Sequence, residues 1–364
     1  MSVTIDIAGL SPERIVFSPS PLAELGAALH ALAEPAHHPG LHNWTTATAC
    51  ALKPDLADRL QEAEFLWRTT RSDILLPHNP GATLAEDLDR LDQMPDEEFV
   101  TAALEISCAA SYGRARPSPL HDPYERDRTR ERAAARGPCQ AAFVERVLAD
   151  PPAVRAWLRR LFEDCEQAFF GDTWQRVRVQ LAADARHKAE VLRRKGLAEA
   201  LATVSPALTL DAERQRIVAD KLVTGQTTAL QPGERAGITF VPTAFGWPHL
   251  LVLHAPGWKP VVHYPVGSPE LPRPQALELV QRRLDAVSHP VRMNLCRTLS
   301  RGTHTTGELA NAHGITAPEV SRHISVLKKA GLLTTRRRGR YVLHQLDLAS
   351  VARLGSDFLE ALLR

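Results

Sequence analysis

The 364-residue sequence lacks several features that define common protein classes. It has no run of 18 or more apolar residues, so we expect no helix that spans a membrane. Its first residues, MSVTIDIAGLSPERI, lack a basic region followed by an apolar stretch, so we expect no secretory signal and a cytoplasmic protein. The five cysteines are odd in number and isolated from one another, which favours free thiols over disulfides or a Cys-x-x-Cys metal site.

Motifs of common enzymes are absent as well. We find no glycine-rich phosphate loop, no Gly-x-Ser-x-Gly and no His-Glu-x-x-His. The histidines from His30 to His263 are dispersed along the sequence. The segment HHPGLHNW, from His37, has residues that could hold a metal, but a polar loop is the simpler interpretation. We therefore predict no catalytic residues, no metal ligands and no cofactor, and we do not expect an enzyme.

The charge of the chain is unevenly distributed. Residues 281–364 contain 14 Lys and Arg and 6 Asp and Glu, a net charge of +8. The part of the chain before Gln281 contains the other 30 Lys and Arg and 36 Asp and Glu, a net charge of −6. A basic C-terminal part beside a mildly acidic body suggests that this part binds a polyanion. The alternative is a basic surface that only aids solubility.

A change of composition divides the chain. The segment GSPELPRPQ, residues 267–275, has three prolines in nine residues and predicts an extended linker. We therefore predict an N-terminal domain over 1–266 and a C-terminal domain over 276–364, which suits the length of the chain.

The N-terminal domain has mostly helical patterning before Gly233 and short β-branched runs after it. We expect residues 115–137 to form a solvated loop or a frayed helix. The fold class is therefore mainly helical α+β. The helical segments are 21–32, 54–69, 84–91, 151–170, 172–195 and 211–223, and the predicted strands are 237–243, 249–255 and 260–266.

The C-terminal domain has the pattern of a helix-turn-helix within ITAPEVSRHISVLKKAGLLTTRRRGRYV, from Ile315. Thr316 and Glu319 match a capping box at the start of a helix that runs to Ala330. This helix has an apolar stripe and an opposite polar face. A short helix predicted over 305–314 ends at Gly314, a residue that can adopt the tight turn between the two helices. The second helix would present its N-terminal polar face to the major groove.

A basic hairpin follows the second helix. The runs LLTTRRR and RYVLHQL are β-prone and meet at Arg338–Gly339. Beside a helix-turn-helix such a hairpin is a wing, whose arginines reach phosphates or a narrow minor groove. The alternative is a solvated hairpin with incidental charge. The helix and the wing together give the predicted DNA-binding residues: Thr316, Ala317, Glu319, Ser321, Arg322, Ser325, Lys328, Arg336, Arg337, Arg338 and Arg340.

These motifs resemble the ArsR/SmtB family of bacterial winged-helix repressors over about Leu284 to Leu346. LDAVSHPVRMNLCRTLSRG is similar to the entry helices of that family, EVSRHISVLKKAGLL to its recognition helix and RRRGRYVLHQL to its wing. The resemblance implies a homodimer that binds an inverted repeat in operator double-stranded DNA and represses transcription until a signal releases it. The N-terminal domain resembles a domain joined to such modules in actinobacteria, which implies no known activity.

The sequence departs from the metal-sensing patterns of this family. Thr305 and Gly307 stand where many relatives carry a pair of thiolates. The last helix contains Asp357 but no histidine, and His344 with Asp347 is an ordinary pair of surface residues. A metal-responsive repressor is therefore the less favoured alternative. Cys296 lies in an apolar helix and is most simply a core thiol.

The role of the N-terminal domain stays open among three alternatives. Trp247, Trp258 and Tyr264, near the predicted strands, suit either a ligand pocket or a hydrophobic core. We expect a domain that senses a small molecule or a protein. A structural dimerisation domain is the second alternative and an enzyme is the third. The last helix, 348–363, suits either pairing between subunits or packing within one.

Overall fold

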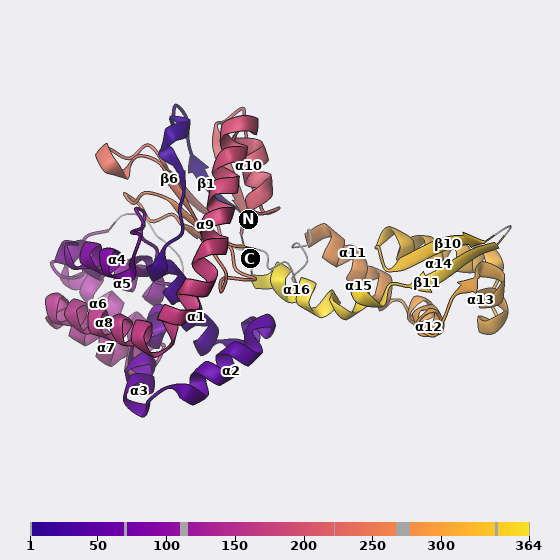
Figure 1. Ribbon diagram of the computed structural model, residues 1–364, viewed down its shortest axis with the longest axis horizontal. Helices are drawn as coiled ribbons and strands as arrows, with labels where there is room; N and C mark the ends of the chain where they lie inside the picture. The colour runs from indigo at the N-terminus through magenta and orange to yellow at the C-terminus, as the bar shows by residue number, and fades with distance from the viewer. Residues whose placement is uncertain are drawn as a thin grey trace. The chain divides into compact units, whose positions relative to one another are not determined.

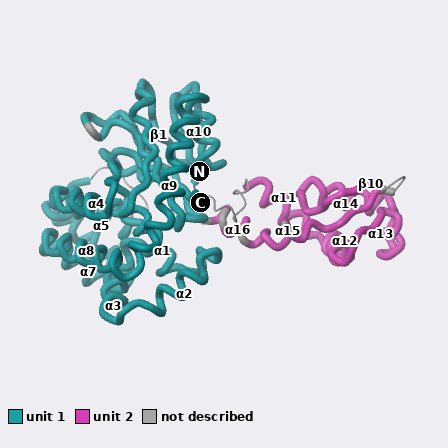
Figure 2. The backbone as a smooth tube through the Cα atoms, in the orientation of Figure 1, with its two compact units in different colours: residues 1–272, 364 teal, residues 273–363 magenta. Residues whose placement is uncertain are grey.

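The computed structural model describes residues 2–68, 71–109, 116–221, 223–266, 277–338 and 341–363. The chain forms two compact units, unit 1 over residues 1–272 and unit 2 over residues 273–363 (Figure 2). The predicted linker, 267–275, lies outside the described residues. Among the described helices, none is long and apolar enough to cross a membrane.

Unit 1 is built mainly from helices, five of which begin with proline, where the missing N–H would have no partner in any case. Helices α6, α7 and α8 lie side by side, and α8 also packs against α3, α4 and α5 (Figure 1). The helices are α1 (Pro21–Ala33), α2 (His42–Ala51), α3 (Pro54–Ala63), α4 (Leu84–Asp92), α5 (Asp96–Ala109), α6 (Pro123–Ala134), α7 (Pro138–Ala149), α8 (Pro151–Cys165), α9 (Gly171–Lys195) and α10 (Leu197–Val204).

Two four-stranded sheets complete unit 1. The first has the order β3 (Leu208–Asp211), β4 (Arg216–Asp220), β1 (Ser2–Asp6), β5 (Gly225–Thr228). The second has the order β2 (Ile15–Phe17), β6 (Ile238–Thr243), β8 (Val261–Pro265), β7 (Leu251–Leu253). The strands predicted over 237–243, 249–255 and 260–266 are confirmed by β6, β7 and β8.

Strand β6 separates the two hydrophobic cores of unit 1. All six of its residues are buried, and α1 and α9 pack against it. Successive side chains of a strand point to opposite faces. Accordingly, Phe240 belongs to the core around the first sheet, whereas Val241 belongs to the larger helical core. The segment after β6 therefore begins at the end of a strand whose two faces both pack against a hydrophobic core.

The helix predicted over 211–223 is wrong. Strand β4 lies there, and it pairs antiparallel with β1 so that Ile217 lies opposite Ile5. A turn precedes β4, in which Gln215 has φ 49°. Pairing with a strand from the start of the chain overrides the local helical preference. The region 115–137 does contain a helix, α6, whose N-cap Asp122 accepts a 2.8 Å hydrogen bond from Glu125 N.

Helix α9 contains a buried lysine, Lys188, whose charge is satisfied by its neighbours. Lys188 is buried, forms an ion pair with Asp184 and lies 4.8 Å from the centre of the Tyr264 ring. The Tyr264 hydroxyl donates a 2.8 Å hydrogen bond to the same carboxylate. The three groups therefore satisfy one another between α9 and β8.

Unit 2 has the fold of a winged helix. Its hydrophobic core contains Leu295, Leu309, Val320 and Leu327. Its elements are α11 (Leu277–Ser288), α12 (Pro290–Leu299), β9 (His304–Thr305), α13 (Thr306–His313), α14 (Ala317–Lys329), β10 (Leu333–Arg338), β11 (Tyr341–Leu346), α15 (Leu348–Ala352) and α16 (Leu354–Leu363). The predicted hairpin is confirmed by β10 and β11, while the last predicted helix is divided into α15 and α16.

Tryptophan is confined to unit 1. All six tryptophans of the chain lie between Trp44 and Trp258, and the sequence from residue 273 onward has none. Tryptophan fluorescence of the full chain therefore reports on unit 1 alone.

Candidate nucleic-acid interface and buried histidine cluster

Helices α13 and α14 form the predicted helix-turn-helix. Gly314 ends α13 with φ 63°, in the left-handed region that favours glycine. Among the described residues, the reciprocal capping box forms at α13, where Thr305 N donates to Glu308 Oε2 at 2.7 Å and Glu308 N donates to Thr305 Oγ1 at 3.2 Å. At α14 we predicted such a box. The structure records the hydroxyl half of it, a 3.4 Å bond from Glu319 N to Thr316 Oγ1.

The two faces of α14 are as the sequence predicts. Val320, Ile324 and Leu327 are at most 5% exposed and pack into the core of unit 2. Glu319 is half-buried. The remaining predicted contact residues of this region are all exposed: Thr316, Ala317, Ser321, Arg322, Ser325 and Lys328.

The wing places two arginines on the surface beside this helix. Strand β10, which packs against α14, pairs with β11 so that Arg336 lies opposite Leu343. Arg336 and Arg337 are exposed. The side chain of Arg338 and the whole of Arg340 lie outside the described residues.

A strand that we did not predict joins the wing to the helix-turn-helix. Strand β9 pairs antiparallel with β11 directly before α13. His344 of β11 is buried, with Nε2 3.3 Å from Thr306 Oγ1 and Nδ1 3.5 Å from Thr335 Oγ1. We predicted that His344 and Asp347 form an ordinary surface pair, which is wrong for His344 because its side chain is buried. Asp347 instead caps α15 through Ser350.

Asp357, the acidic residue of the last helix, lies in a buried ion pair. Its Oδ2 accepts a 2.6 Å hydrogen bond from Arg283 Nη1, and its Oδ1 accepts one of 3.1 Å from Arg353 Nη2. Arg283 Nε also donates to the carbonyl of Ala330 at 3.3 Å. The carboxylate therefore connects α11 and α16 near the end of α14.

Cys296 is buried in the core of unit 2, and burial raises the pKa of its thiol.

Two family models match the chain. Residues 1–270 match a family of unknown function (DUF5937), and residues 287–336 match a helix-turn-helix domain. The HTH-type transcriptional repressor SmtB of Mycobacterium tuberculosis is 33% identical over 97 residues, which are 24% of this chain and 72% of that protein. The chain belongs to the DUF5937 family and carries a C-terminal ArsR/SmtB-family domain.

Two further relatives match the ArsR/SmtB-family domain. The biofilm growth-associated repressor of Xylella fastidiosa is 37% identical over 75 residues, which are 21% of this chain. The transcriptional repressor SdpR of Bacillus subtilis is 31% identical over 62 residues, which are 17% of this chain and 69% of that protein. The chain spans 66% of the length of the Xylella protein.

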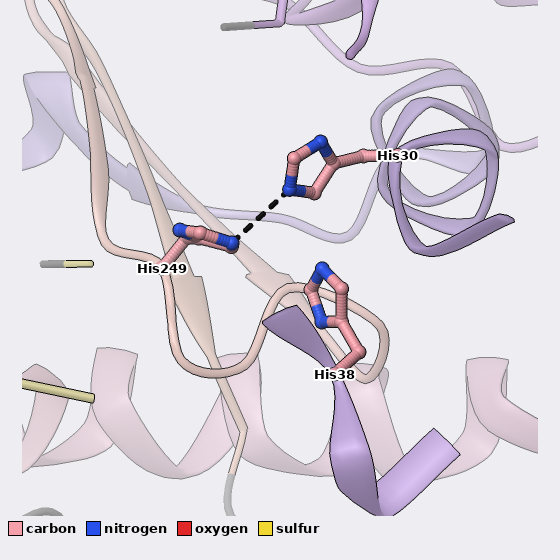
Figure 3. Close-up of side chains that lie close together, drawn as sticks. All are labelled: His30, His38 and His249. Carbon is pink, nitrogen blue, oxygen red and sulfur yellow. Dashed lines mark hydrogen bonds between the residues drawn. The ribbon is translucent and has the colours of Figure 1, made fainter. Parts of the chain in front are cut away.

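The DUF5937 domain contains a group of buried histidines. His30 in α1, His38 in the segment after α1 and His249 before β7 converge (Figure 3). The Nε2 atoms of His30 and His249 are 3.1 Å apart. The Nδ1 atom of His30 lies 2.8 Å from the carbonyl oxygen of Trp67, and that of His38 lies 2.5 Å from the carbonyl oxygen of Trp247.

Burial favours the neutral form of two of these imidazoles, those of His30 and His38. Burial first, and then the positive charge of Arg71, lowers the pKa of His30 to about 3 and that of His38 to about 4. Glu24 is also buried, and burial raises the pKa of its carboxyl group to about 7. Arg71 interacts electrostatically with Glu24, and its Nη1 lies 2.9 Å from Nδ1 of His263.

Polar atoms without a hydrogen-bond partner are concentrated in this region. Among the described residues, seven buried side-chain atoms lack a partner, and five of them belong to the histidine cluster, its neighbour His37, or the group formed by Glu24, Arg71 and His263. An unsatisfied buried polar group costs about 1–3 kcal/mol. The five atoms are Glu24 Oε2, His37 Nδ1, His38 Nε2, Arg71 Nε and His263 Nε2.

The sequence did not reveal this cluster. We interpreted HHPGLHNW as a polar loop, but His38 is fully buried. No local motif unites the three histidines, because His249 lies 219 residues after His30.

Of the aromatic residues proposed for a pocket, Tyr264 is fully buried in a core, while Trp258 lines a cavity of about 360 Å³ together with Leu104.

Proposed function

We propose that the protein is a bacterial transcriptional regulator, a repressor, which binds operator double-stranded DNA in the cytoplasm through unit 2. The exposed polar face of α14 beside the exposed arginines of the wing carries this proposal. The net charge of +8 over residues 281–364 suits a polyanionic partner. The names of the relatives, which are transcriptional repressors, agree with it.

The two elements have different roles in this proposal. Arg322 and Ser325 on α14 contact base edges in the major groove, where a bidentate arginine selects guanine. Thr316 and Ala317 lie at the helix N-terminus, whose free N–H groups suit a phosphate. Arg336 and Arg337, with Arg338 and Arg340, contact phosphates or the minor groove and hold the helix in register. Lys328 contributes charge to the same surface, and Glu319 accepts a hydrogen bond from cytosine N4.

We propose that the regulator binds as a homodimer. Helix α16 leaves Phe358 and Leu362 41% and 48% exposed, although both are large apolar residues. Leu348 of α15 is 55% exposed. A second copy of the chain would cover these side chains and place two α14 helices at half-sites one helical turn apart, as an inverted repeat requires.

We propose that unit 1 regulates this binding by sensing a small molecule or a protein, and that it is not an enzyme. The cavity beside Trp258 and the unsatisfied buried atoms around Arg71 are features that a ligand would fill or satisfy.

The test is genome-wide footprinting with the full-length protein. We expect protection of inverted repeats with two major-groove faces on one side of the duplex. Binding to RNA alone, or to DNA with no preferred site, would refute the proposal. Light scattering tests the dimer separately: Phe358→Ser with Leu362→Ser should halve the molar mass, whereas Val179→Ser, at an exposed apolar residue of α9, should not change it.

A further inference from the structure

We propose that unit 1 binds a first-row transition-metal ion, with zinc as the reference ion, through the Nε2 atoms of His30, His38 and His249 (Figure 3). The proposal goes beyond DNA binding and does not depend on it, because the site lies entirely in unit 1 and is tested without DNA.

The spacing of the three ligand atoms is close to that of a metal site. A tetrahedral zinc ion with Zn–N bonds of 2.0–2.1 Å holds its nitrogen ligands about 3.3 Å apart. Nε2 of His30 and Nε2 of His249 are separated by 3.1 Å. The widest separation within the three-histidine set is no more than 4.8 Å, so a small side-chain rotation closes it.

Backbone carbonyls orient the imidazole rings of this cluster in the way that the histidine ligands of metal ions are commonly oriented. A ligating histidine commonly donates its second ring N–H to a carbonyl oxygen, which fixes the tautomer and directs the lone pair at the ion. Nδ1 of His30 and of His38 have such acceptors in the carbonyls of Trp67 and Trp247. Both Nε2 lone pairs are thereby left for the centre of the cluster.

His38 supplies an independent observation. Its side chain is fully buried, and its Nε2 atom has no hydrogen-bond partner among the described residues. A buried acceptor without a donor is unfavourable, and a bound cation would satisfy it. His37 lies beside the cluster, with its ring centre 5.7 Å from that of His249, and its Nδ1 atom is also buried without a partner.

The donor set indicates which ions fit. Three neutral imidazoles suit Zn²⁺, Co²⁺, Ni²⁺ and Cu²⁺, whereas Mg²⁺ and Ca²⁺ require oxygen ligands. Three protein ligands leave one tetrahedral position open. Arg71 opposes a cation here, since its charge acts on both His30 and His38. In its ionised form the carboxyl group of Glu24 acts on Arg71 with the opposite sign and offsets this charge.

The experiment uses metal-stripped full-length protein without DNA. Zn²⁺ is titrated in competition with a chromophoric chelator, and Co²⁺ is followed by absorption spectroscopy. We expect one ion per chain and the visible bands of four-coordinate cobalt. We also expect no near-ultraviolet band from thiolate-to-cobalt charge transfer, because all three ligands are imidazoles.

Two variants test the ligands. His38→Gln keeps a donor for the Trp247 carbonyl but loses the imidazole, and His249→Ala removes a second ligand. Each should weaken zinc binding at least about 100-fold, since even the loss of a group that only orients a ligand costs about 10–100-fold. His121→Ala is the control, because His121 is an exposed histidine of the same unit, at 68% side-chain exposure. It should bind zinc as the native chain does.

Three results would overturn the proposal: a native chain that binds neither ion, zinc binding unchanged in both variants, or a strong thiolate band with cobalt. Tryptophan emission verifies that each variant is folded, because every tryptophan lies in unit 1. If a variant unfolds, the cobalt spectrum of the native chain still decides, since it distinguishes imidazole from thiolate ligands without any substitution.

Discussion

The two units of the chain place their polar side chains in opposite ways. In unit 1, His38, Arg71 and His263 lie in the interior. In unit 2, the residues with the most evident chemistry, such as Arg322 and Arg336, lie on the surface. All seven buried side-chain atoms without a partner among the described residues belong to unit 1.

This difference indicates two kinds of partner. Exposed basic residues on a rigid helix and hairpin suit a macromolecule that remains outside, such as a nucleic acid duplex. Polar atoms that are buried and incompletely bonded suit a ligand small enough to be enclosed. Four predictions test this contrast, in order of decreasing effect.

The largest effect should come from the buried ion pair between Arg283 and Asp357 in unit 2, an exception to its exposed chemistry. Asp357→Ala leaves Arg283 buried at 7% exposure without its main counter-ion, and should destabilise unit 2 by about 3–5 kcal/mol. Chemical denaturation followed by circular dichroism measures this, because tryptophan reports only unit 1. Replacing both partners, as Arg283→Met with Asp357→Leu, should destabilise much less. Equal losses in the single and double variants would contradict this account.

Acid should act on unit 1 through a histidine outside the cluster. Burial first, and then the charge of Lys259, lowers the pKa of His78 from 6.5 to about 4. Below pH 6.5 the unfolded chain gains a proton that the folded chain does not, so stability present above pH 6.5 is lost toward pH 4.

The substitution His78→Gln removes this contribution. Between pH 7 and pH 4 the stability of the variant relative to the native chain should therefore rise by about 3 kcal/mol. Urea unfolding monitored by tryptophan emission measures the difference. A relative stability independent of pH would show that His78 is not held neutral by the fold.

A third prediction concerns sequence selection by α14. Arg322→Ala should lower operator affinity by about 1–3 kcal/mol per half-site while affinity for random DNA falls much less, because a bidentate arginine discriminates among bases. Competition binding at fixed salt measures both affinities. Arg297→Ala, at an exposed arginine of α12, is the matched control. Equal losses for operator and random DNA would instead assign Arg322 to the phosphates.

The smallest effect should come from the wing. Arg336→Ala removes one phosphate contact per subunit, so the slope of log K against log salt should flatten by about two units per dimer. Operator and random DNA should lose affinity alike, since phosphates carry no sequence information. Affinity measured over a series of salt concentrations gives the slope. An unchanged slope with reduced operator preference would indicate that Arg336 reads the shape of the groove.

The sequence predicts unit 2 well because its signals are local. Gly314 permits the turn, Thr316 caps the next helix, and Val320 and Ile324 mark its buried face within a few residues of one another. The division of the last helix and the short strand β9 were missed. Strand β9 contains only His304 and Thr305, and it forms through pairing with β11, on the far side of the helix-turn-helix in the sequence.

Parts of unit 1 were not predicted because their decisive contacts join residues that are far apart in the sequence. The alternation of Arg216–Asp220 becomes a strand signal once β1 is available as its partner, at the other end of the domain. The histidine cluster also depends on contacts between residues far apart in the sequence, since His30 and His249 meet only after β6 and α1 pack together. Neither residue stands out in its own segment, so the pattern is visible only in three dimensions.

The great distance in sequence between His30 and His249 has a mechanical consequence. A ligand held by both joins segments 219 residues apart and closes a very long loop, as a disulfide would. Because the two segments separate when the domain unfolds, such a ligand binds only the folded chain, and its binding free energy adds to the stability of the whole domain until the ligand is removed. The ligand would therefore act as a reversible cross-link, which slows hydrogen exchange and proteolysis across the whole domain and not only at the site.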